Sequence, residues 1–151
     1  MSLTLHTTLG PITIELFCKI APISCYHFLA LAASGGYTNT IFFSITEACL
    51  HGGDATNTGK AGQTLYPSDI MPSLPDEISP SLSHNKRGIV SLLNKFNQHN
   101  TSRSQFYITL GPCEELDSEH TIIGNVVSGW QTLDLCEKTP VQDKNYRPIT
   151  P

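Results

Sequence analysis

Cys49 and His51 stand two positions apart in the run Ala48-Cys-Leu-His-Gly52. In an extended strand, side chains two residues apart lie on the same face. A thiol and an imidazole placed in this way could bind a metal ion, or could act as nucleophile and base. The sequence offers no second pair of ligands at the spacing of a zinc site, and no oxyanion motif accompanies the two residues. We therefore expect no metal, no cofactor and no hydrolase activity.

A second stretch of polar and aromatic residues is Ser104-Gln-Phe-Tyr-Ile-Thr-Leu110. It follows Gly88-Ile-Val-Ser-Leu-Leu-Asn94 after a polar loop from Lys95 to Arg103. Both runs are rich in β-branched or aromatic residues and have the length of a strand, so the pattern predicts a strand pair. Taken alone, Gln105-Phe106-Tyr107 indicates only alternating surface and core positions.

The elements that would position these residues begin with a hairpin. Residues 3 to 17 alternate, with a break at Leu9-Gly10-Pro11, and the apolar residues of one face are Leu3, Leu5, Ile12, Ile14 and Leu16. From Pro22 the apolar period becomes helical, through Cys25, Phe28, Leu29 and Ala32, and Gly35-Gly36 follows the predicted helix. Residues 41–44 and 48–52 read as strands, 54–62 as a turn-rich loop and 67–85 as one long surface loop.

The C-terminal third continues with a turn over 114–120, a strand over 121–127 and a helix over 131–138. Strands in meander order with two isolated helices favour a mainly β fold, a closed antiparallel barrel with a helix at each mouth. The 151 residues fit a single domain, 1–151, and no linker divides them.

Composition and charge exclude several classes of partner. The formal net charge is −4 and the 9 Lys and Arg residues form no cluster, so we expect no direct nucleic-acid binding and no membrane binding. The N-terminus has no signal-peptide pattern. The five cysteines are widely spaced and include no C-x-x-C, which favours reduced thiols and a cytoplasmic or nuclear protein.

The sequences of several segments resemble those of the cyclophilins, the peptidyl-prolyl cis/trans isomerases. They are most similar to the short single-domain members associated with splicing. The matching segments are Leu5-His-Thr-Thr-Leu-Gly-Pro-Ile-Thr-Ile-Glu-Leu-Phe17, Phe28-Leu-Ala-Leu31, Gly53-Asp54, Thr58-Gly59, Asp76-Glu77, His84-Asn85-x-Arg87-Gly88, Ser104-Gln105-Phe106, Leu116-Asp117, His120, Gly124, Leu133 and Tyr146-Arg147-Pro148. The resemblance implies an eight-stranded barrel that binds a peptide around an X-Pro bond.

Such a site has to lower the barrier to rotation about an amide, about 18–20 kcal/mol. The resemblance implies an apolar pocket for the proline ring, polar groups for the peptide backbone, and an arginine near the rotating bond. Only interactions that strengthen at the twisted transition state raise the rate. The arginine is the principal interaction of this kind.

The first wall of the implied site departs from the family pattern. Relative to the family, the segment before Gly53-Asp54 is one residue shorter, and the arginine position falls on Ser44. The first arginine anywhere in the chain is Arg87. The pocket phenylalanine, methionine and glutamine correspond, in that order, to Ala48, Cys49 and His51. We therefore expect catalysis to be weak or lost.

The second wall of the implied pocket matches the family pattern more closely than the first wall does. Asn94, Gln105, Leu116 and His120 match pocket positions, and Tyr107 stands where a phenylalanine is usual. Leu93 replaces a small alanine and the loop to Ser104 is two residues longer, which would narrow the groove. Glu115 occupies the position of a tryptophan in cyclosporin-sensitive members, so we expect weak or no cyclosporin binding.

Relatives continue past Tyr146-Arg147-Pro148 into a strand that closes the barrel, whereas this sequence stops at Pro151. We therefore expect one of three situations: the barrel is partly open, a partner or a neighbouring copy covers its edge, or the sequence is a truncated product.

Two interpretations of function remain. The first is an isomerase of X-Pro bonds with impaired catalysis, and the alternative is a non-catalytic module that binds a proline-containing segment of a protein, including a splicing-complex protein. His51 could be only a half-buried strand residue, and His120 could be paired with a turn carbonyl. Arg103 could reach the pocket, although an arginine in such a loop is more often solvated.

Overall fold

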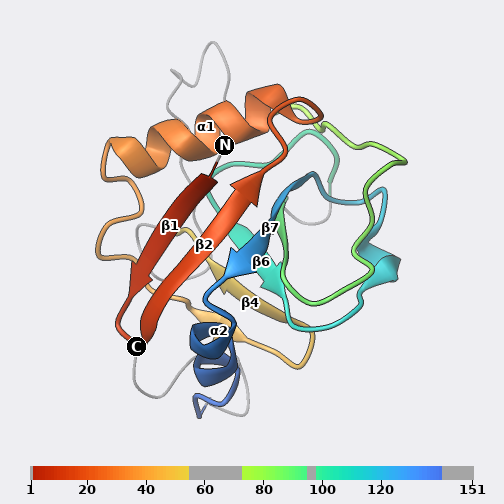
Figure 1. The fold of residues 1–151 in the computed structure, drawn as a ribbon. Helices are drawn as coiled ribbons and strands as arrows, with labels where there is room; N and C mark the ends of the chain where they lie inside the picture. Colours follow the sequence, from red (N-terminus) through yellow and green to blue (C-terminus); the bar gives the residue numbers. More distant parts are fainter. Residues whose placement is uncertain (1, 55–72, 95–97, 141–151) are drawn as a thin grey trace.

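The computed structural model describes residues 2–54, 73–94 and 98–140, and its elements are coloured along the sequence in Figure 1. The strands are β1 (Ser2–Thr7), β2 (Gly10–Leu16), β3 (Ser44–Ile45), β4 (Cys49–Gly52), β5 (Ile89–Leu92), β6 (Phe106–Thr109) and β7 (Ile122–Ser128). The helices are α1 (Pro22–Ala33), the 3₁₀ helix η2 (Glu114–Leu116) and α2 (Trp130–Glu137).

The strands form one antiparallel, curled sheet in the order β1-β2-β7-β5-β6-β4-β3. The mainly β, two-helix architecture is confirmed, but the meander order is wrong, since β7 enters between β2 and β5. The crossing at β7 needs a close approach, because a Cβ on Gly124 would lie 2.2 Å from the backbone oxygen of Glu15. Among the described residues the barrel is partly open, with β1 and β3 as its outer strands.

The predicted hairpin is confirmed, and its alternation sets which face is buried. Ile12 and Ile14 are fully buried and Leu16 is nearly so, while the side chains between them point outward. Leu3 and Leu5 of β1 are only half-buried and pack against the same core. The chain reverses through Thr8 and Leu9, one residue earlier than the predicted break.

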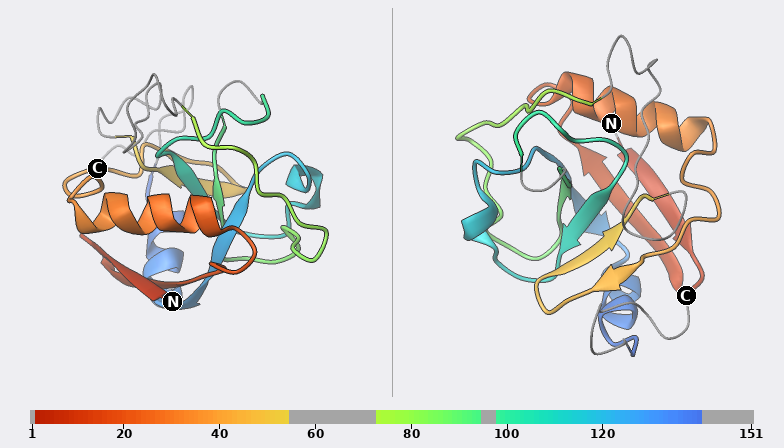
Figure 2. Two further views of the ribbon diagram at one scale, coloured as in Figure 1. Left: turned by 90° about the horizontal axis from the view of Figure 1, so that it is seen from above. Right: turned by 180° about the vertical axis from the view of Figure 1, so that it is seen from behind.

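The two helices lie at opposite ends of the curled sheet (Figures 1 and 2). The predicted start of α1 at Pro22 is confirmed, but the buried stripe is offset from the expected one: His27 and Leu31 are buried, whereas Leu29 and Ala32 are half-buried. Ala21 is the N-cap residue of α1, but its methyl side chain cannot accept a hydrogen bond and so cannot cap the helix. Glu77 does so instead, accepting hydrogen bonds from the backbone N–H groups of Ser24 (2.6 Å) and Ile23 (3.2 Å).

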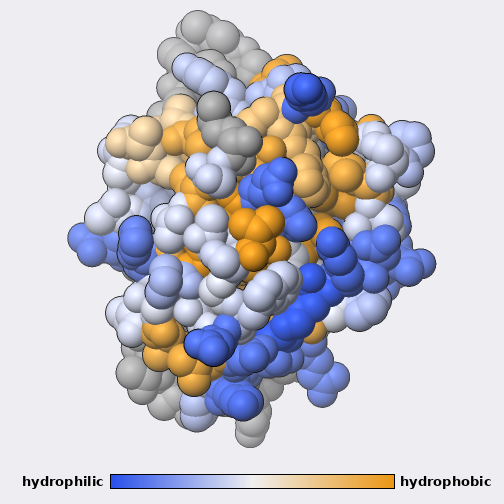
Figure 3. Space-filling model, in the orientation of Figure 1, coloured by the Kyte–Doolittle hydropathy of each residue, from blue (hydrophilic) through white to orange (hydrophobic). Residues whose placement is uncertain are grey.

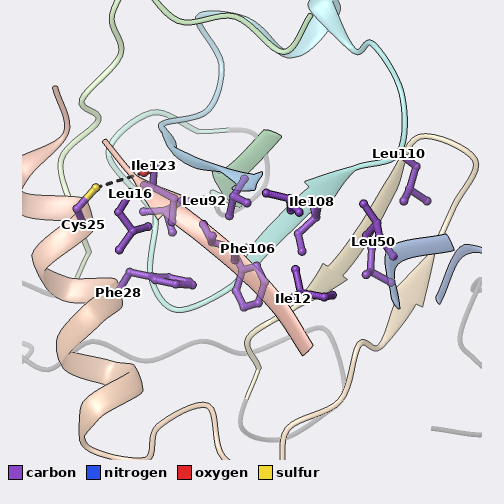
Figure 4. Close-up of a cluster of buried hydrophobic side chains, with 14 of the residues drawn as sticks. Ile12, Leu16, Cys25, Phe28, Leu50, Leu92, Phe106, Ile108, Leu110 and Ile123 are labelled. Atoms are coloured by element: carbon purple, nitrogen blue, oxygen red, sulfur yellow. Dashed lines mark hydrogen bonds between the residues drawn. The ribbon is translucent and has the colours of Figure 1, made fainter. Parts of the chain in front are cut away.

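The core fills the concave side of the sheet. Figure 4 shows Phe28 and Leu16 next to α1, Phe106 and Ile108 in the middle of the cluster, and Leu50 at its far side. The Phe28 and Phe106 rings meet edge to face at 5.3 Å between centroids. The Cys25 thiol donates to the Ile123 carbonyl at 3.4 Å, which ties α1 to the start of β7. On the face shown in Figure 3, polar and apolar groups are interspersed.

Other boundaries differ from the expectations by a few residues. The strand expected over residues 41–44 is only Ser44–Ile45, while Cys49–Gly52 agrees with the second expected strand. Residues 73–85 contain no helix or named strand, as predicted, and Leu74 forms an isolated bridge with Ser102. The loop expected over 54–62 falls almost wholly outside the described residues, as do residues 95–97 and the C-terminal Tyr146-Arg147-Pro148.

Candidate functional site

β4 and β6 bring the two stretches singled out from the sequence together. His51 is the register partner of Tyr107, and Cys49 is the partner of Thr109. Leu50 and Ile108 between them face the core, so Cys49, His51 and Tyr107 lie on the opposite face of the sheet. The shared face predicted for the thiol and the imidazole is confirmed.

Tyr107 is the centre of this site. Its ring is surrounded by three imidazoles, with centroid distances of 5.9 Å to His51, 5.9 Å to His84 and 5.5 Å to His120. The His84 ring is inclined to it by only 19° and lies at its hydroxyl end, while the His120 ring meets it nearly perpendicularly. Tyr107 is 1% exposed, so it forms the floor of the site. Burial raises the pKa of its phenol, which stays protonated.

Beneath Tyr107 lies a buried polar network that sequence reasoning missed as part of the site. Nδ1 of His84 and its backbone N–H both donate to Oδ1 of Asp117, each at 2.7 Å. Nε2 of His84 lies 2.8 Å from the hydroxyls of both Ser91 and Tyr107. Burial lowers the pKa of His84, although Asp117 acts in the opposite direction. The sequence signal was present, since His84 and Asp117 belong to segments that resemble the family.

The order Asp117, His84, Ser91 has the connectivity of a hydrolytic triad, but not the access that catalysis requires. Ser91 and His84 are both 0% exposed, so no substrate carbonyl can reach the serine. Burial opposes ionisation of Asp117, but hydrogen bonds from the His84 backbone, Ser83 and the His84 ring hold its pKa below the usual value. The network therefore fixes the position of Tyr107 and does not serve as a nucleophile.

Cys49 packs against Tyr107 and Cys113, with Leu93 and Leu116 partly buried around them. Burial, followed by the neighbouring Cys113, raises the pKa of Cys49 to about 12, and burial raises that of Cys113 as well. Both thiols are therefore uncharged near neutral pH and poor nucleophiles. Within the described residues no three potential ligands come together as a metal site. No pattern in the sequence predicted that Cys113 lies at this site.

The two predicted site histidines are neutral at physiological pH. Burial, with a smaller effect of His120, lowers the pKa of His51 to about 4, and burial lowers that of His120. His51 is half-buried, and it faces the Phe43 ring at 6.3 Å between centroids. Nδ1 of His120 is buried and has no hydrogen-bond partner among the described residues, so the pairing of this nitrogen with a turn carbonyl is not observed.

Ser44 lies directly opposite His51 in the β3–β4 ladder and is half-buried. The two arginines of the described residues lie elsewhere. Arg87 donates to Asp134 (2.6 Å) and Glu137 (3.0 Å) on α2, and the Nε of Arg103 donates to the hydroxyl of Ser73 at 3.5 Å. Within the described part of the chain, no guanidinium is recorded in contact with Ser44 or His51.

The remaining predicted residues divide into two groups. Asn94 is buried and its Nδ2 donates to the Glu119 carbonyl at 2.9 Å. Gln105 is half-buried, and its backbone carbonyl accepts from the Leu93 N–H at 2.9 Å. Ala48 differs from them because its side chain is exposed in the β3–β4 turn. Only its backbone takes part, since its carbonyl accepts from the Leu110 N–H at 2.8 Å.

These features define a cluster of neutral imidazoles and thiols around the buried Tyr107 ring, on the face of the curled antiparallel sheet opposite the core. A family model described as cyclophilin type peptidyl-prolyl cis-trans isomerase/CLD matches residues 2–151. The chain belongs to the cyclophilin-type peptidyl-prolyl cis-trans isomerase family. The resemblance noted from the sequence is thereby confirmed over the whole chain.

Similar proteins agree with this assignment. Human peptidyl-prolyl cis-trans isomerase-like 3 is 45% identical over 150 residues, covering 99% of this chain and 89% of that protein. The protein of the same name in Dictyostelium discoideum is 43% identical over 146 residues, covering 96% of this chain and 87% of that protein. A crystal structure of a cyclophilin-type isomerase of Cryptosporidium parvum, obtained in the presence of the dipeptide Ala-Pro, superposes with a TM-score of 0.92 at 38% identity, covering 99% of this chain and 92% of that chain.

Proposed function

We propose that this cyclophilin-family protein binds X-Pro segments at the Tyr107 site and isomerises them weakly. The observation that carries the proposal is the pairing of Ser44 with His51 across β3 and β4. It supports the assignment of Ser44 to the position where the family has its catalytic arginine. A hydroxyl at this position supplies no fixed positive charge.

Binding of a proline-containing segment is supported by the chemistry of the site. Three of its half-buried residues, Leu93, Leu116 and His51, are apolar or neutral, and its half-buried carboxylate, Asp117, is already hydrogen-bonded to His84. An X-Pro segment is uncharged at its imide, so neutral imidazoles and amides can hydrogen-bond it without leaving a buried charge unpaired. The Cryptosporidium parvum relative was crystallised in the presence of Ala-Pro, which supports the same ligand class for this chain.

Weak catalysis follows from what the site lacks. Loss of one preorganised donor aimed at the transition state costs about 10²- to 10³-fold in rate. His51 stands opposite Ser44 but is neutral, because burial lowers its pKa to about 4. A neutral imidazole can donate one hydrogen bond, which is weaker than the charged bonds of a guanidinium.

The experiment is a comparison of binding and turnover with one ligand. A prolyl tetrapeptide is titrated into isotope-labelled protein, and cis/trans exchange of the same peptide is measured by NMR with the protein at catalytic concentration. We expect shifts at His51, Gln105 and His120 together with slow exchange. Exchange as fast as that given by an ordinary cyclophilin would contradict the weak catalysis, and absence of any shift at these residues would contradict the binding site.

The same titration separates this function from a non-catalytic binding module, which would show the shifts but no acceleration of exchange. That alternative gains no separate support from the geometry.

For the biological context we propose a cytoplasmic or nuclear protein that binds a partner in an assembly such as a splicing complex. Co-purification of tagged protein with spliceosomal proteins, compared with a His51→Ala, Gln105→Ala double variant, tests this context, and equal recovery by both proteins would contradict binding through the site.

We also propose that cyclosporin binds weakly or not at all, because the exposed carboxylate of Glu115 stands where sensitive relatives carry an indole. Replacing the charged group by an apolar ring should favour contact with this apolar cyclic peptide. Titration of the wild type and of Glu115→Trp with cyclosporin, followed by NMR, is the test. Equal and tight binding by both would contradict the proposal.

A further inference from the structure

A groove of about 970 Å³ lies on the other side of β4 from the Tyr107 site. It runs between the two outer strands of the sheet, and its walls include Leu3 and Leu5 of β1, Ile45 of β3 and Leu50 of β4. Its floor includes Phe42 and Phe106. In the view from behind, the red β1–β2 hairpin and the yellow β3–β4 pair lie next to each other (Figure 2).

The backbone of β1 faces this groove with hydrogen-bonding groups that no other strand among residues 2–54, 73–94 and 98–140 uses. His6 is paired with Pro11, which has no N–H, so this position cannot exchange two hydrogen bonds and is a non-hydrogen-bonded pair. Pairs of the two kinds alternate along an antiparallel ladder, so Thr4 is of the same kind as His6. The N–H and C=O groups of Thr4 and His6 therefore point away from β2, and no described strand pairs with this edge.

The side chains around the groove select for an uncharged ligand. None of the described residues that line it is Asp, Glu, Lys or Arg, and its polar groups are threonines, Asn39, the phenol of Tyr37 and His6. Tyr37 already donates to the Ser104 carbonyl at 2.8 Å. A charged side chain entering the groove would be desolvated without an ionic partner among these residues, and this is unfavourable.

We propose that the groove is an interaction surface for an extended segment of a protein partner, which enters as a β-strand beside β1 with uncharged, apolar side chains at every second position. Main-chain hydrogen bonds to Thr4 and His6 would supply affinity, and the apolar pockets between Leu3, Leu5 and Ile45 would select the alternate side chains. The β1 strand has six residues, which sets the length of segment that can pair with it.

A second copy of the chain fits this position less well. A strand lying between β1 and β3 needs both of its own edges free. β1 is paired with β2 and β3 is paired with β4, and every other named strand has two neighbours. Two copies could therefore meet edge to edge at β1, but neither would fill the groove.

The probe is a fluorescein-labelled heptapeptide that alternates valine with threonine between terminal lysines, and binding is followed by fluorescence anisotropy and by amide shifts. The matched control peptide carries aspartate in place of the valines. We expect the control, and a version N-methylated at alternate residues, to bind at least about tenfold more weakly. Shifts should appear at residues 3–7, 45 and 50 and should be absent at residues 113–120. Equal binding of all three peptides, or no binding, would overturn the proposal.

Two matched variants test the protein side. Leu3→Lys places a charge in the groove, while Val127→Lys introduces the same charge at an exposed apolar position, 45% accessible, elsewhere on the sheet. We expect Leu3→Lys to abolish peptide binding and Val127→Lys to retain it, and we expect both variants to show cooperative thermal unfolding.

Two results would identify another occupant of the groove. If sedimentation shows that the wild type is a dimer and that Leu3→Lys is a monomer, the occupant is a second copy of the chain. Peptide binding that tightens at least tenfold when the chain is cut after Pro140 would make the chain's own C-terminal residues the occupant. Either result would overturn the proposal.

Discussion

The hydroxyl of Tyr107 lies 2.8 Å from Nε2 of His84, at the same distance as the hydroxyl of Ser91. Nδ1 of His84 must carry the ring proton, because it faces the carboxylate of Asp117, and Nε2 is therefore an acceptor with a single lone pair. Two donors compete for one acceptor. The floor of the candidate site is held in place by this arrangement, and each hydroxyl can replace the other.

This redundancy predicts a non-additive pair of substitutions. Either Tyr107→Phe or Ser91→Ala leaves one donor for Nε2, so each should lower the free energy of unfolding by only about 0.5–1.5 kcal/mol. The double variant leaves Nε2 buried and unpaired, and it should be less stable than the sum of the two effects by about 1 kcal/mol or more. Urea denaturation of the four proteins checks this prediction. Additive losses would show that the hydroxyls do not share the acceptor.

The carboxylate of Glu77 is predicted to stabilise α1 from a distant part of the chain. Because it caps the N–H groups of Ile23 and Ser24, Glu77→Ala should cost about 0.5–2 kcal/mol of unfolding free energy. Glu47→Ala, at an exposed turn position, should change it by less than about 0.5 kcal/mol. Thermal and urea unfolding measure both variants, and equal losses would argue against the cap.

Acid should destabilise the protein before its carboxylates titrate. Burial lowers the folded-state pKa of His27, His51, His84 and His120 below 6.5, so in acid the unfolded chain binds more protons than the folded one. Their contribution is constant above pH 6.5 and is lost as the pH falls toward the folded pKa, about 4 for His51. The free energy of unfolding, measured in urea at several pH values, should fall over this range. His51→Gln should make the fall shallower, and a flat profile would contradict the burial of neutral imidazoles.

The cysteines should differ sharply in reactivity. Cys18 is half-buried, whereas Cys25, Cys49, Cys113 and Cys136 are buried, and burial raises the pKa of all four. An aromatic disulfide reagent at pH 8 should therefore titrate one thiol rapidly in the folded protein and all five in urea. Cys18→Ser should remove the rapid phase. Fast reaction of a second thiol would show that a buried cysteine is reachable.

The sequence predicted most of the elements because their patterns are local. Alternation in residues 3–17 gave the hairpin, and Pro22 followed by apolar residues at helical spacing gave α1. The strand order was not predictable in this way, since the entry of β7 between β2 and β5 depends on Gly124 meeting the backbone of Glu15, a contact between residues far apart in the chain.

Part of the candidate site was predicted because it, too, depends on a local pattern, the periodicity of the strands. Cys49, His51 and Tyr107 meet because β4 and β6 are neighbours, and strand periodicity is enough to place them on one face. Cys113 and Ser91 were missed because nothing in their local sequence distinguishes a residue under the site from any other buried residue. Ala48 was placed by correspondence with the family, and the turn that exposes its side chain is a three-dimensional feature.

The most direct test of weak catalysis is the rate of cis/trans exchange of a prolyl tetrapeptide, measured by NMR for this protein and for the Cryptosporidium parvum relative at equal concentration. With Ser44 opposite His51 and no arginine recorded in contact with either among the described residues, we expect exchange about 10²- to 10³-fold slower than with the relative. Ser44→Arg should recover part of the difference. Wild-type exchange within about tenfold of the relative, unchanged by Ser44→Arg, would contradict the account.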